Sequence, residues 1–276
     1  MRSFFSAAAA VVALVLAGVS VPAIWAERTV INQDGFLAMA TPLGNDPKFQ
    51  AALAAATAKT ATSKLDAVPG LVTAAAPLIE SAVKDLASDP EYPAAWAETL
   101  RRSHELTLVN PAANANDQGV LNLDVAPLLQ LVLKKVGSSL GQQVQSPAQV
   151  LITLGTKSQR EVLVHLRELA PLGAWGAIGA GLAAALALLI ARRRSTTLAL
   201  LGLGGLVIVA AWKVLLNLVS QSVLNSSGGN PVADLFKQEY VGVAGGSFDV
   251  WILVGAIAAG ALLLIGLSGR VATRRR

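Results

Sequence analysis

Four long apolar segments constrain the fold of this chain more than any other feature. They are Phe4 to Trp25, Leu172 to Ala191, Leu198 to Leu218 and Val250 to Leu267. A hydrocarbon core about 30 Å thick is crossed by about 20 apolar residues in an α-helix. Only 14% of the 276 residues are charged, whereas about a quarter are charged in an ordinary soluble domain. The sequence therefore predicts an all-α, polytopic membrane protein with four transmembrane helices.

The distribution of charge predicts which side of the membrane each segment occupies. Arginine is the only charged residue in the flanks on one side of the spans, at positions 2, 192–194, 270 and 274–276. Residues 27–171 and 219–249 contain all 17 acids and 13 of the 22 Lys and Arg. Because cationic flanks remain cytoplasmic, we expect a plasma-membrane protein with both termini inside the cell and with 27–171 and 219–249 outside it.

The first apolar segment has two interpretations. Its basic start, its apolar run and Ala26 are compatible with a cleaved signal peptide. The run is long for such a peptide, and Pro22 and Ile24 fit a cleavage site poorly, which favours an uncleaved anchor. The predicted organisation is an anchor at 1–26, an extracytoplasmic helical domain at 27–171, and a three-helix membrane region at 172–276 with an outer loop at 219–249.

Helix signals dominate the predicted outer domain. Asp46 and Pro47 provide an N-cap and a first-turn proline that begin a helix. Residues 121–124 alternate and residues 150–154 are rich in β-branched side chains, so each is a candidate for a short extended segment. The remaining pattern predicts helices at 48–65, 71–86, 91–109, 125–136 and 158–169.

Composition argues against most enzyme classes. The chain has no cysteine, which excludes disulfides, zinc–thiolate sites and iron–sulfur clusters. No nucleophile, base and acid can be named as a set, and the basic residues are divided among membrane flanks instead of forming a patch. We therefore expect a non-enzymatic protein with no cofactor, no metal and no nucleic-acid partner.

Lys213 is the ionisable residue inside the predicted spans, and such residues are functional candidates by default. It lies some 16 residues beyond the cytoplasmic turn, beside Trp212. This position favours a side chain that extends to the outer interface over a buried ion pair or a solute site. Asn217, one helical turn further on, would extend a polar stripe on the same face.

Two further candidates, Trp96 and His104, share the helix predicted at 91–109. The histidine could sense pH or contact a ligand. A partly buried, hydrogen-bonded imidazole is the favoured interpretation, because no second ligand falls beside it at metal-binding spacing. Small residues recur every four positions at Gly173, Ala177, Gly181 and Ala185, and again at Ala256 and Gly260. Such spacing suggests close helix packing.

Several short motifs occur in a recognisable order. They are Arg28 to Phe36, Thr41-Pro42-Leu43, Asn45-Asp46-Pro47, Tyr92 with Trp96 and His104, and Gly119 to Asp124 followed by Pro127. In this order the chain resembles, over nearly its whole length, a family of actinobacterial integral membrane proteins without an assigned biochemical activity. The resemblance implies an anchor, an exported helical domain and a membrane bundle, and no catalytic residue. Asp34, in the first motif, is the fifth candidate functional residue.

Three function classes remain open. The first is a cell-envelope protein whose extracytoplasmic domain mediates interaction or scaffolding. The second is an accessory subunit of a larger membrane complex, and the third is a transporter, channel or sensor component with a polar path near Lys213. The expected partners are the lipid bilayer, other membrane or envelope proteins, and a second copy of the chain. The first two classes rank higher, because transport folds place ionisable groups near mid-membrane.

Overall fold

The computed structural model describes residues 2–65, 77, 81–82, 84–110, 119–140, 147–226 and 229–274. About 86% of it is helical, so the predicted all-α class is confirmed. The chain divides into two compact units. We call Met1–Ile31, Leu166–Val223 and Val243–Arg276 the four-helix unit. We call Asn32–His165 and Leu224–Gly242 the inserted unit.

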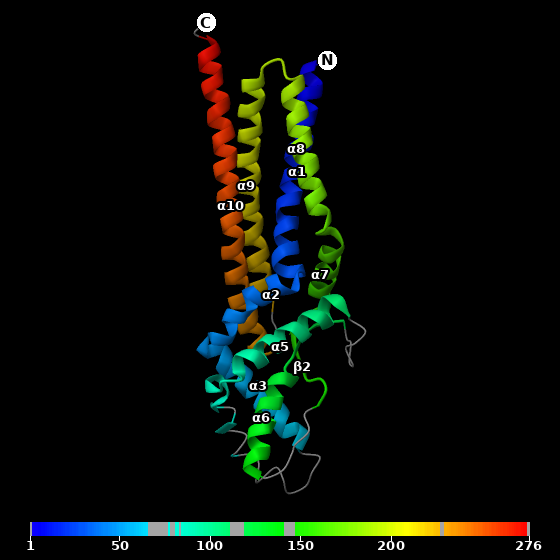
Figure 1. Cartoon of the computed structure of the whole chain (residues 1–276), viewed down its shortest axis with the longest axis vertical. Coiled ribbons are helices and arrows are strands. Elements are labelled where there is room, and N and C mark those ends of the chain that lie inside the picture. Colours follow the sequence, from blue (N-terminus) through cyan, green and yellow to red (C-terminus); the bar gives the residue numbers. More distant parts are fainter. Residues whose placement is uncertain are drawn as a thin grey trace. The chain divides into compact units, whose positions relative to one another are not determined.

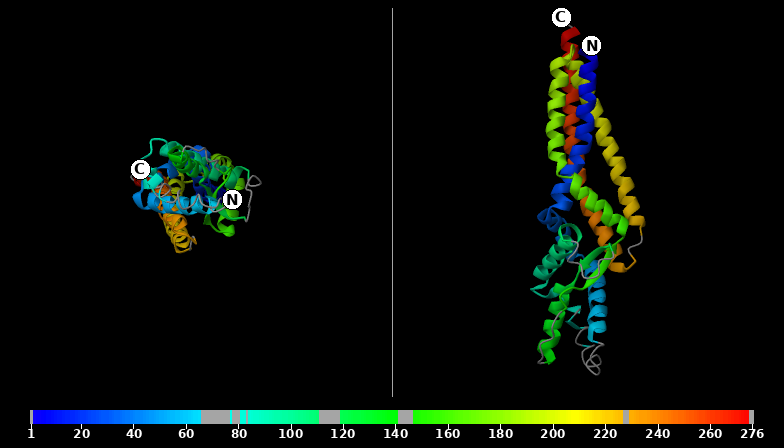
Figure 2. Two further views of the ribbon diagram at one scale, coloured as in Figure 1. Left: turned by 90° about the horizontal axis from the view of Figure 1, so that it is seen from below. Right: turned by 90° about the vertical axis from the view of Figure 1, so that its right-hand side faces the viewer.

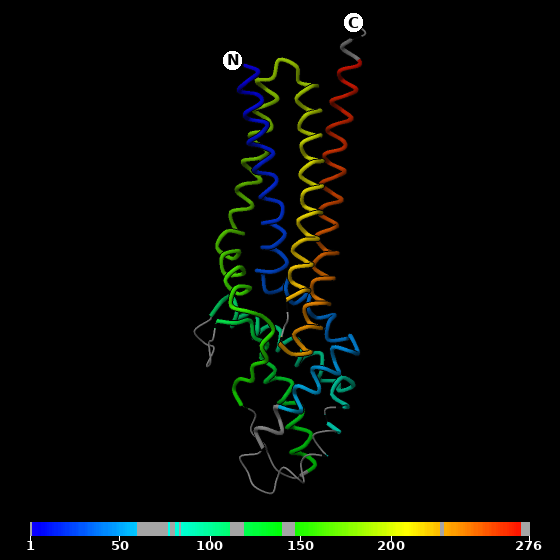
Figure 3. Tube along the Cα trace, turned by 180° about the vertical axis from the view of Figure 1, so that it is seen from behind, coloured from blue at the N-terminus to red at the C-terminus, as the bar shows by residue number. Residues whose placement is uncertain are grey.

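Four helices form most of the four-helix unit, and they run alongside one another (Figures 1 and 2). They are α1 (Arg2–Ala26), which a π-helical turn continues to Ile31, α8 (Leu172–Ile190), α9 (Arg194–Asn225) and α10 (Pro231–Arg274). Each is long and apolar enough to cross a membrane, as the sequence predicts. The start of α1, the α8–α9 connection and the end of α10 lie at the same end of this unit (Figure 3).

The segment predicted as an outer loop, 219–249, is largely helical. Helix α9 continues to Asn225 and α10 begins at Pro231. The side chain of Asn230 accepts the Ala233 N–H at 2.9 Å and so caps α10. Hydropathy marks where a helix is apolar, but these helices continue into polar sequence because no helix breaker interrupts them.

Helices α1 and α8 pack antiparallel through small residues seven positions apart. The buried positions at this spacing are Ser6, Ala13 and Ser20 in α1, and Gly173, Ala180 and Ala187 in α8. At one end, Ser6 Oγ donates a hydrogen bond to the carbonyl of Ala187 at 2.8 Å. At the other, a Cβ on Gly173 would lie 2.9 Å from the Cβ of Ala23. Small side chains thus let the two backbones approach closely.

The predicted four-residue stripes coincide with the packing faces only in part, because Gly173 packs against α1 and Ala256 against a buried cluster, whereas other members do not pack. A Cβ at Gly181 or at Gly260 would meet nothing within 4 Å. Close contact between α9 and α10 instead involves Gly202 and Gly266, where a Cβ would overlap backbone atoms of the other helix. The four-residue recurrence therefore reflects composition, since small residues are abundant in these helices.

The inserted unit combines short helices with one strand pair. Its elements are α2 (Gln33–Ala40), a 3₁₀ turn (Thr41–Asn45), α3 (Pro47–Leu65), a second 3₁₀ turn (Leu86–Ser88), α5 (Tyr92–His104) with a π-helical turn (Glu105–Val109), β1 (Leu121–Asp124), α6 (Ala126–Leu140), β2 (Leu151–Gly155) and the start of α7 (Lys157–Leu169). The strands pair antiparallel, with Asp124 opposite Leu151. Both candidate extended segments are therefore strands. The helix predicted at 71–86 falls largely outside the described residues.

The core of the inserted unit includes residues that are distant in sequence. Phe49, Trp96 and Leu128 are essentially inaccessible to solvent in this core. Val232 and Ala233, from the first turn of α10, are buried in the same cluster. The sequence left open whether the segment after the third apolar helix folds against the outer domain. Within the inserted unit it does, because it completes the core.

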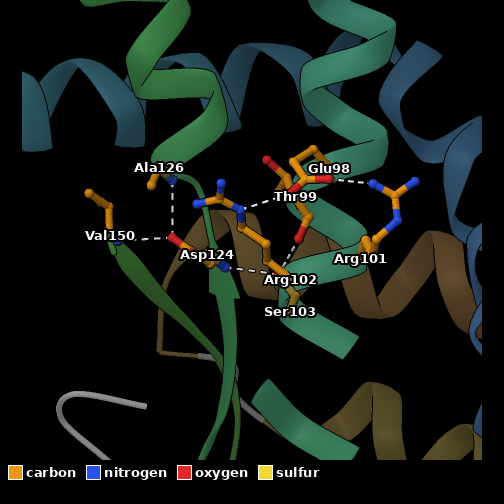
Figure 4. A network of polar contacts seen from close by, with 8 residues as sticks. All are labelled: Glu98, Thr99, Arg101, Arg102, Ser103, Asp124, Ala126 and Val150. Atoms are coloured by element: carbon orange, nitrogen blue, oxygen red, sulfur yellow. Dashed lines mark hydrogen bonds and ion pairs between the residues drawn. The ribbon is translucent and has the colours of Figure 1, made fainter. Parts of the chain in front are cut away.

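Asp124, at the end of β1, forms buried hydrogen bonds to α5, to α6 and to the residue that precedes β2 (Figure 4). The residue is 2% exposed, and its Oδ1 accepts the N–H groups of Ala126 at 3.1 Å and Val150 at 2.9 Å. Its own N–H donates to Ser103 Oγ at 2.9 Å, and that hydroxyl donates to the carbonyl of Thr99. The predicted role of Asp124 as the cap of the following helix is confirmed, and the same carboxylate also fixes the start of β2.

Candidate functional site

Each helix of the four-helix unit carries one tryptophan at a similar distance from its arginine-bearing end. Trp25, Trp175, Trp212 and Trp251 lie 17 to 23 residues from the nearest arginine of that end. At about 1.5 Å per residue this spacing corresponds to about 26 to 35 Å, close to the thickness of a hydrocarbon core. These four of the five tryptophans define what we call the tryptophan level.

Side chains at the tryptophan level join α1, α9 and α10. The Nε1–H of Trp212 donates to the carbonyl of Gly18 at 2.9 Å, and that of Trp25 donates to Ser247 Oγ at 3.3 Å. The ring of Phe248 lies 5.0 Å from Trp25 and 6.2 Å from Trp212, centroid to centroid. The indole N–H groups of Trp25 and Trp212 therefore have acceptors within the unit, while their rings supply apolar contact area.

An ion pair lies at the same level. Lys213 Nζ bonds both carboxylate oxygens of Asp249, at 2.6 and 2.9 Å, and the two side chains are 48% and 46% exposed. The sequence favoured a lysine that extends to the interface without a protein partner. In the structure Lys213 has a partner, Asp249 on α10, and both side chains of the pair are about half exposed.

Asp249 is the functional candidate that sequence reasoning missed. It was assigned to an outer loop, but it lies on α10. A usable signal was present: Lys213 is 19 residues after Arg194, and Asp249 is 21 residues before Arg270. Similar distances from a shared end place two charges on neighbouring antiparallel helices at about the same depth, where they can pair.

The charges at the two ends of the four-helix unit differ. At the tryptophan end are three cations and three acids: Glu27, Arg28, Arg167, Glu168, Lys213 and Asp249. The other end carries arginine alone. The Arg28 guanidinium carbon lies 5.9 Å from the centroid of the Trp251 ring, a cation–π contact that holds this cation against the tryptophan level. One end is therefore cationic and the other is balanced.

Trp96 and His104 belong to the packing of the inserted unit. Trp96 is 1% exposed, and its Nε1–H donates to the carbonyl of Thr41 at 3.2 Å. His104 is 4% exposed, and its ring lies 5.1 Å from that of Phe36. Successive ring contacts link these two residues in the order Trp96, Phe49, Phe236, Tyr240, Phe36 and His104. The favoured interpretation was a partly buried, hydrogen-bonded imidazole, and the structure buries His104 almost completely.

The other two candidates are exposed and lie in different units. Asp34 is in the first turn of α2, next to the N-cap Asn32, where a carboxylate stabilises the helix dipole. Asn217 is exposed on α9. The structure thus separates Asp34, Trp96 and His104 from Lys213 and Asn217, which belong to the four-helix unit.

Burial and pairing perturb a few titratable groups of the inserted unit. Burial raises the pKa of Tyr92 to about 12, and its hydroxyl donates to the carbonyl of Gly44 at 3.0 Å. The hydrogen bond from Arg102, with a second from Arg101, lowers the pKa of Glu98. Both shifts belong to structural contacts, since neither group faces a cluster of catalytic side chains in the part of the chain described here.

Within the described ranges, no three His, Asp or Glu side chains lie close enough together to hold a metal ion. The arrangement best defined by geometry is therefore the tryptophan level with its ion pair. Comparisons with protein-family models, with curated proteins and with solved structures find no match for this chain.

Proposed function

We propose that this chain is a plasma-membrane protein with four transmembrane helices, whose inserted unit lies outside the cytoplasm and mediates interaction or scaffolding in the cell envelope without catalysing a reaction. The observation that carries this proposal is the polarity of the four-helix unit. Eight arginines lie at one end with no acid among them, whereas the four tryptophans lie at the other end, where cations and acids balance. Arginine-rich ends remain cytoplasmic, and tryptophans settle at membrane–water interfaces.

The connectivity of the chain supports the proposed side for the inserted unit. The chain passes between the two units after Ile31, before Leu166, after Val223 and before Val243. Each of these points lies beyond the tryptophan of its helix, away from the arginine end. The inserted unit contains 14 acids and 11 cations, and segments as long as 32–165 translocate largely regardless of their charge, so these cations do not oppose the proposed side.

The contacts of the inserted unit favour a binding or scaffolding role. Its candidate residues Trp96 and His104 are part of the core, and its outer faces carry ion pairs such as Glu91–Lys134 and Asp89–Lys135. A packed core beneath a charged surface leaves the buried candidates to stability and the surface to contacts with other molecules. The accessory-subunit alternative uses the same surface, with a partner in the membrane.

The transporter alternative is weaker on specific grounds. Between the arginine end and the tryptophan level, the four helices contain no charged residue. Ion and proton paths normally place ionisable groups within that depth. The pair of Lys213 and Asp249 lies at the boundary, where it offers no continuous polar path across the core.

Single cysteines test the orientation, because the natural chain has none. Ser139→Cys lies at an exposed position of α6 in the inserted unit, and Thr196→Cys lies at the start of α9. A membrane-impermeant maleimide added to intact cells should label Ser139→Cys, and should label Thr196→Cys only after the cells are broken. The reverse pattern would overturn the proposal. Crosslinking on cells, followed by mass spectrometry, then identifies what the inserted unit contacts.

A further inference from the structure

The ion pair of α9 and α10 retains unused bonding capacity. The Lys213 ammonium has three N–H donors and the Asp249 carboxylate accepts about four hydrogen bonds. Their contact with each other uses only part of that capacity, and both side chains are about half exposed. Each can therefore bind a further charged group without breaking the pair.

The surface around this pair is apolar. Val250 and Leu253 on α10, one and four residues nearer the arginine end than Asp249, are 59% and 60% exposed. In a bilayer such side chains contact acyl chains, whereas the charges lie at headgroup depth beside Trp212. The feature is therefore a pair of opposite charges that faces lipid directly above an apolar surface.

We infer that Lys213 and Asp249 bind the headgroup of a zwitterionic phospholipid that carries a primary ammonium, as phosphatidylethanolamine does. The inference rests on the proposed function, because it requires that the tryptophan level lie at a membrane surface. The lipid phosphate accepts hydrogen bonds from Lys213, and the lipid ammonium donates hydrogen bonds to Asp249. The two charges of the ligand thus meet two opposite charges of the protein.

The balance of charge selects this headgroup over the alternatives. An anionic headgroup meets repulsion from Asp249, and the other charges at this end of the unit also cancel. A quaternary ammonium, as in phosphatidylcholine, has no N–H to donate to the carboxylate. At a half-exposed site, we expect a preference of about fivefold for the primary ammonium headgroup.

Native mass spectrometry of the detergent-solubilised full chain tests this inference. Equimolar phosphatidylethanolamine, phosphatidylcholine and phosphatidylglycerol with identical acyl chains are offered together. The natural chain should retain about five times more phosphatidylethanolamine than either competitor. Asp249→Asn should shift the preference to phosphatidylglycerol, because Lys213 then acts as an unbalanced cation. Equal retention of the three lipids by the natural chain would overturn the inference.

Paired variants separate the site from its surroundings. The double variant K213L/D249L should lose the preference, whereas the reversed pair K213D/D249K should keep it, because both charges are still present. The control R167Q/E168Q removes one cation and one acid from the same end of the unit, and should change nothing. Persistence of the preference in K213L/D249L would refute the site, and circular dichroism confirms that each variant is folded.

The two proposals fail in different ways. A reversed cysteine-labelling pattern with an intact headgroup preference removes the proposed orientation and leaves the lipid site standing. The expected labelling pattern without any headgroup preference removes the lipid site alone.

Discussion

The strongest quantitative test of the inserted unit is the removal of the Asp124 carboxylate. In Asp124→Ala, the N–H groups of Ala126 and Val150 both lose their acceptor, Oδ1, in a site that is 2% exposed. Each buried donor left without a partner costs about 1 to 3 kcal/mol, so the pair costs about 2 to 6 kcal/mol. This is a large fraction of the stability of a typical domain, about 5 to 15 kcal/mol.

Asp124→Asn is the matched control. Both backbone hydrogen bonds end on the same oxygen, and asparagine keeps an oxygen at that position while it removes the charge. We therefore expect Asp124→Asn to retain most of the stability that Asp124→Ala loses. The comparison separates the contribution of the two hydrogen bonds to stability from the contribution of the carboxylate charge.

Hydrogen exchange of the full chain in detergent measures the effect locally. At the lower limit of about 2 kcal/mol, amides around Ala126 and Val150 should exchange about 30-fold faster in Asp124→Ala than in the natural chain. Amides of α8, in the other unit, provide the internal reference. Exchange within about threefold of the natural chain would refute the reasoning, and so would an equal acceleration in Asp124→Asn.

Two other predictions follow from single contacts. Gly266→Ala should lower the melting temperature of the full chain in detergent, at a cost of about 1 to 3 kcal/mol, because its Cβ would overlap the backbone of Ala199. Gly260→Ala is the control, because a Cβ there meets nothing within 4 Å, and it should be neutral or stabilising. An equal loss of stability in both variants would contradict the packing argument. The Arg102 guanidinium lowers the pKa of Glu98 below its usual 4.5, so this contact stabilises the fold above that pH and its contribution is lost as the pH falls through the lowered pKa. Thermal melts between pH 6 and about pH 3 should show a smaller acid-induced loss in Glu98→Gln, and identical profiles would exclude the pair.

The sequence predicts much of the fold where one physical rule acts alone. Apolar length identifies the four long helices, and the Asp46–Pro47 start of α3 is confirmed by the hydrogen bond from the Phe49 N–H to Asp46 Oδ1, at 2.7 Å. Asp124 was recognised as a cap for the same reason. Each of these features depends on residues that are neighbours along the chain, so a local pattern contains the information.

Features that depend on which residues meet across helices were not predicted. The α1–α8 contact follows a seven-residue spacing of mixed Ser, Ala and Gly, with Ser6 and Ala187 at one end, whereas the four-residue pattern of Gly and Ala shares only Gly173 with it. In an alanine-rich helix, many faces look equally small, and only the partner helix selects one. Asp249 was missed for a related reason, because its significance depends on Lys213, 36 residues earlier.

The boundaries of the predicted outer domain, 27–171, differ from those of the inserted unit, which also includes Leu224–Gly242. A domain at 27–171 would be continuous, but the core of the inserted unit also contains Val232 and Ala233. The ring of Phe236 stacks on that of Tyr240 at 5.6 Å and lies 6.2 Å from that of Phe49, centroid to centroid. The ring contacts that link Trp96 to His104 therefore also require α10. The chain is synthesised from its N-terminus, so these residues appear only after α9 has been made. The core of the inserted unit therefore cannot close before the third apolar helix is complete, and its folding is coupled to the synthesis of the four-helix unit.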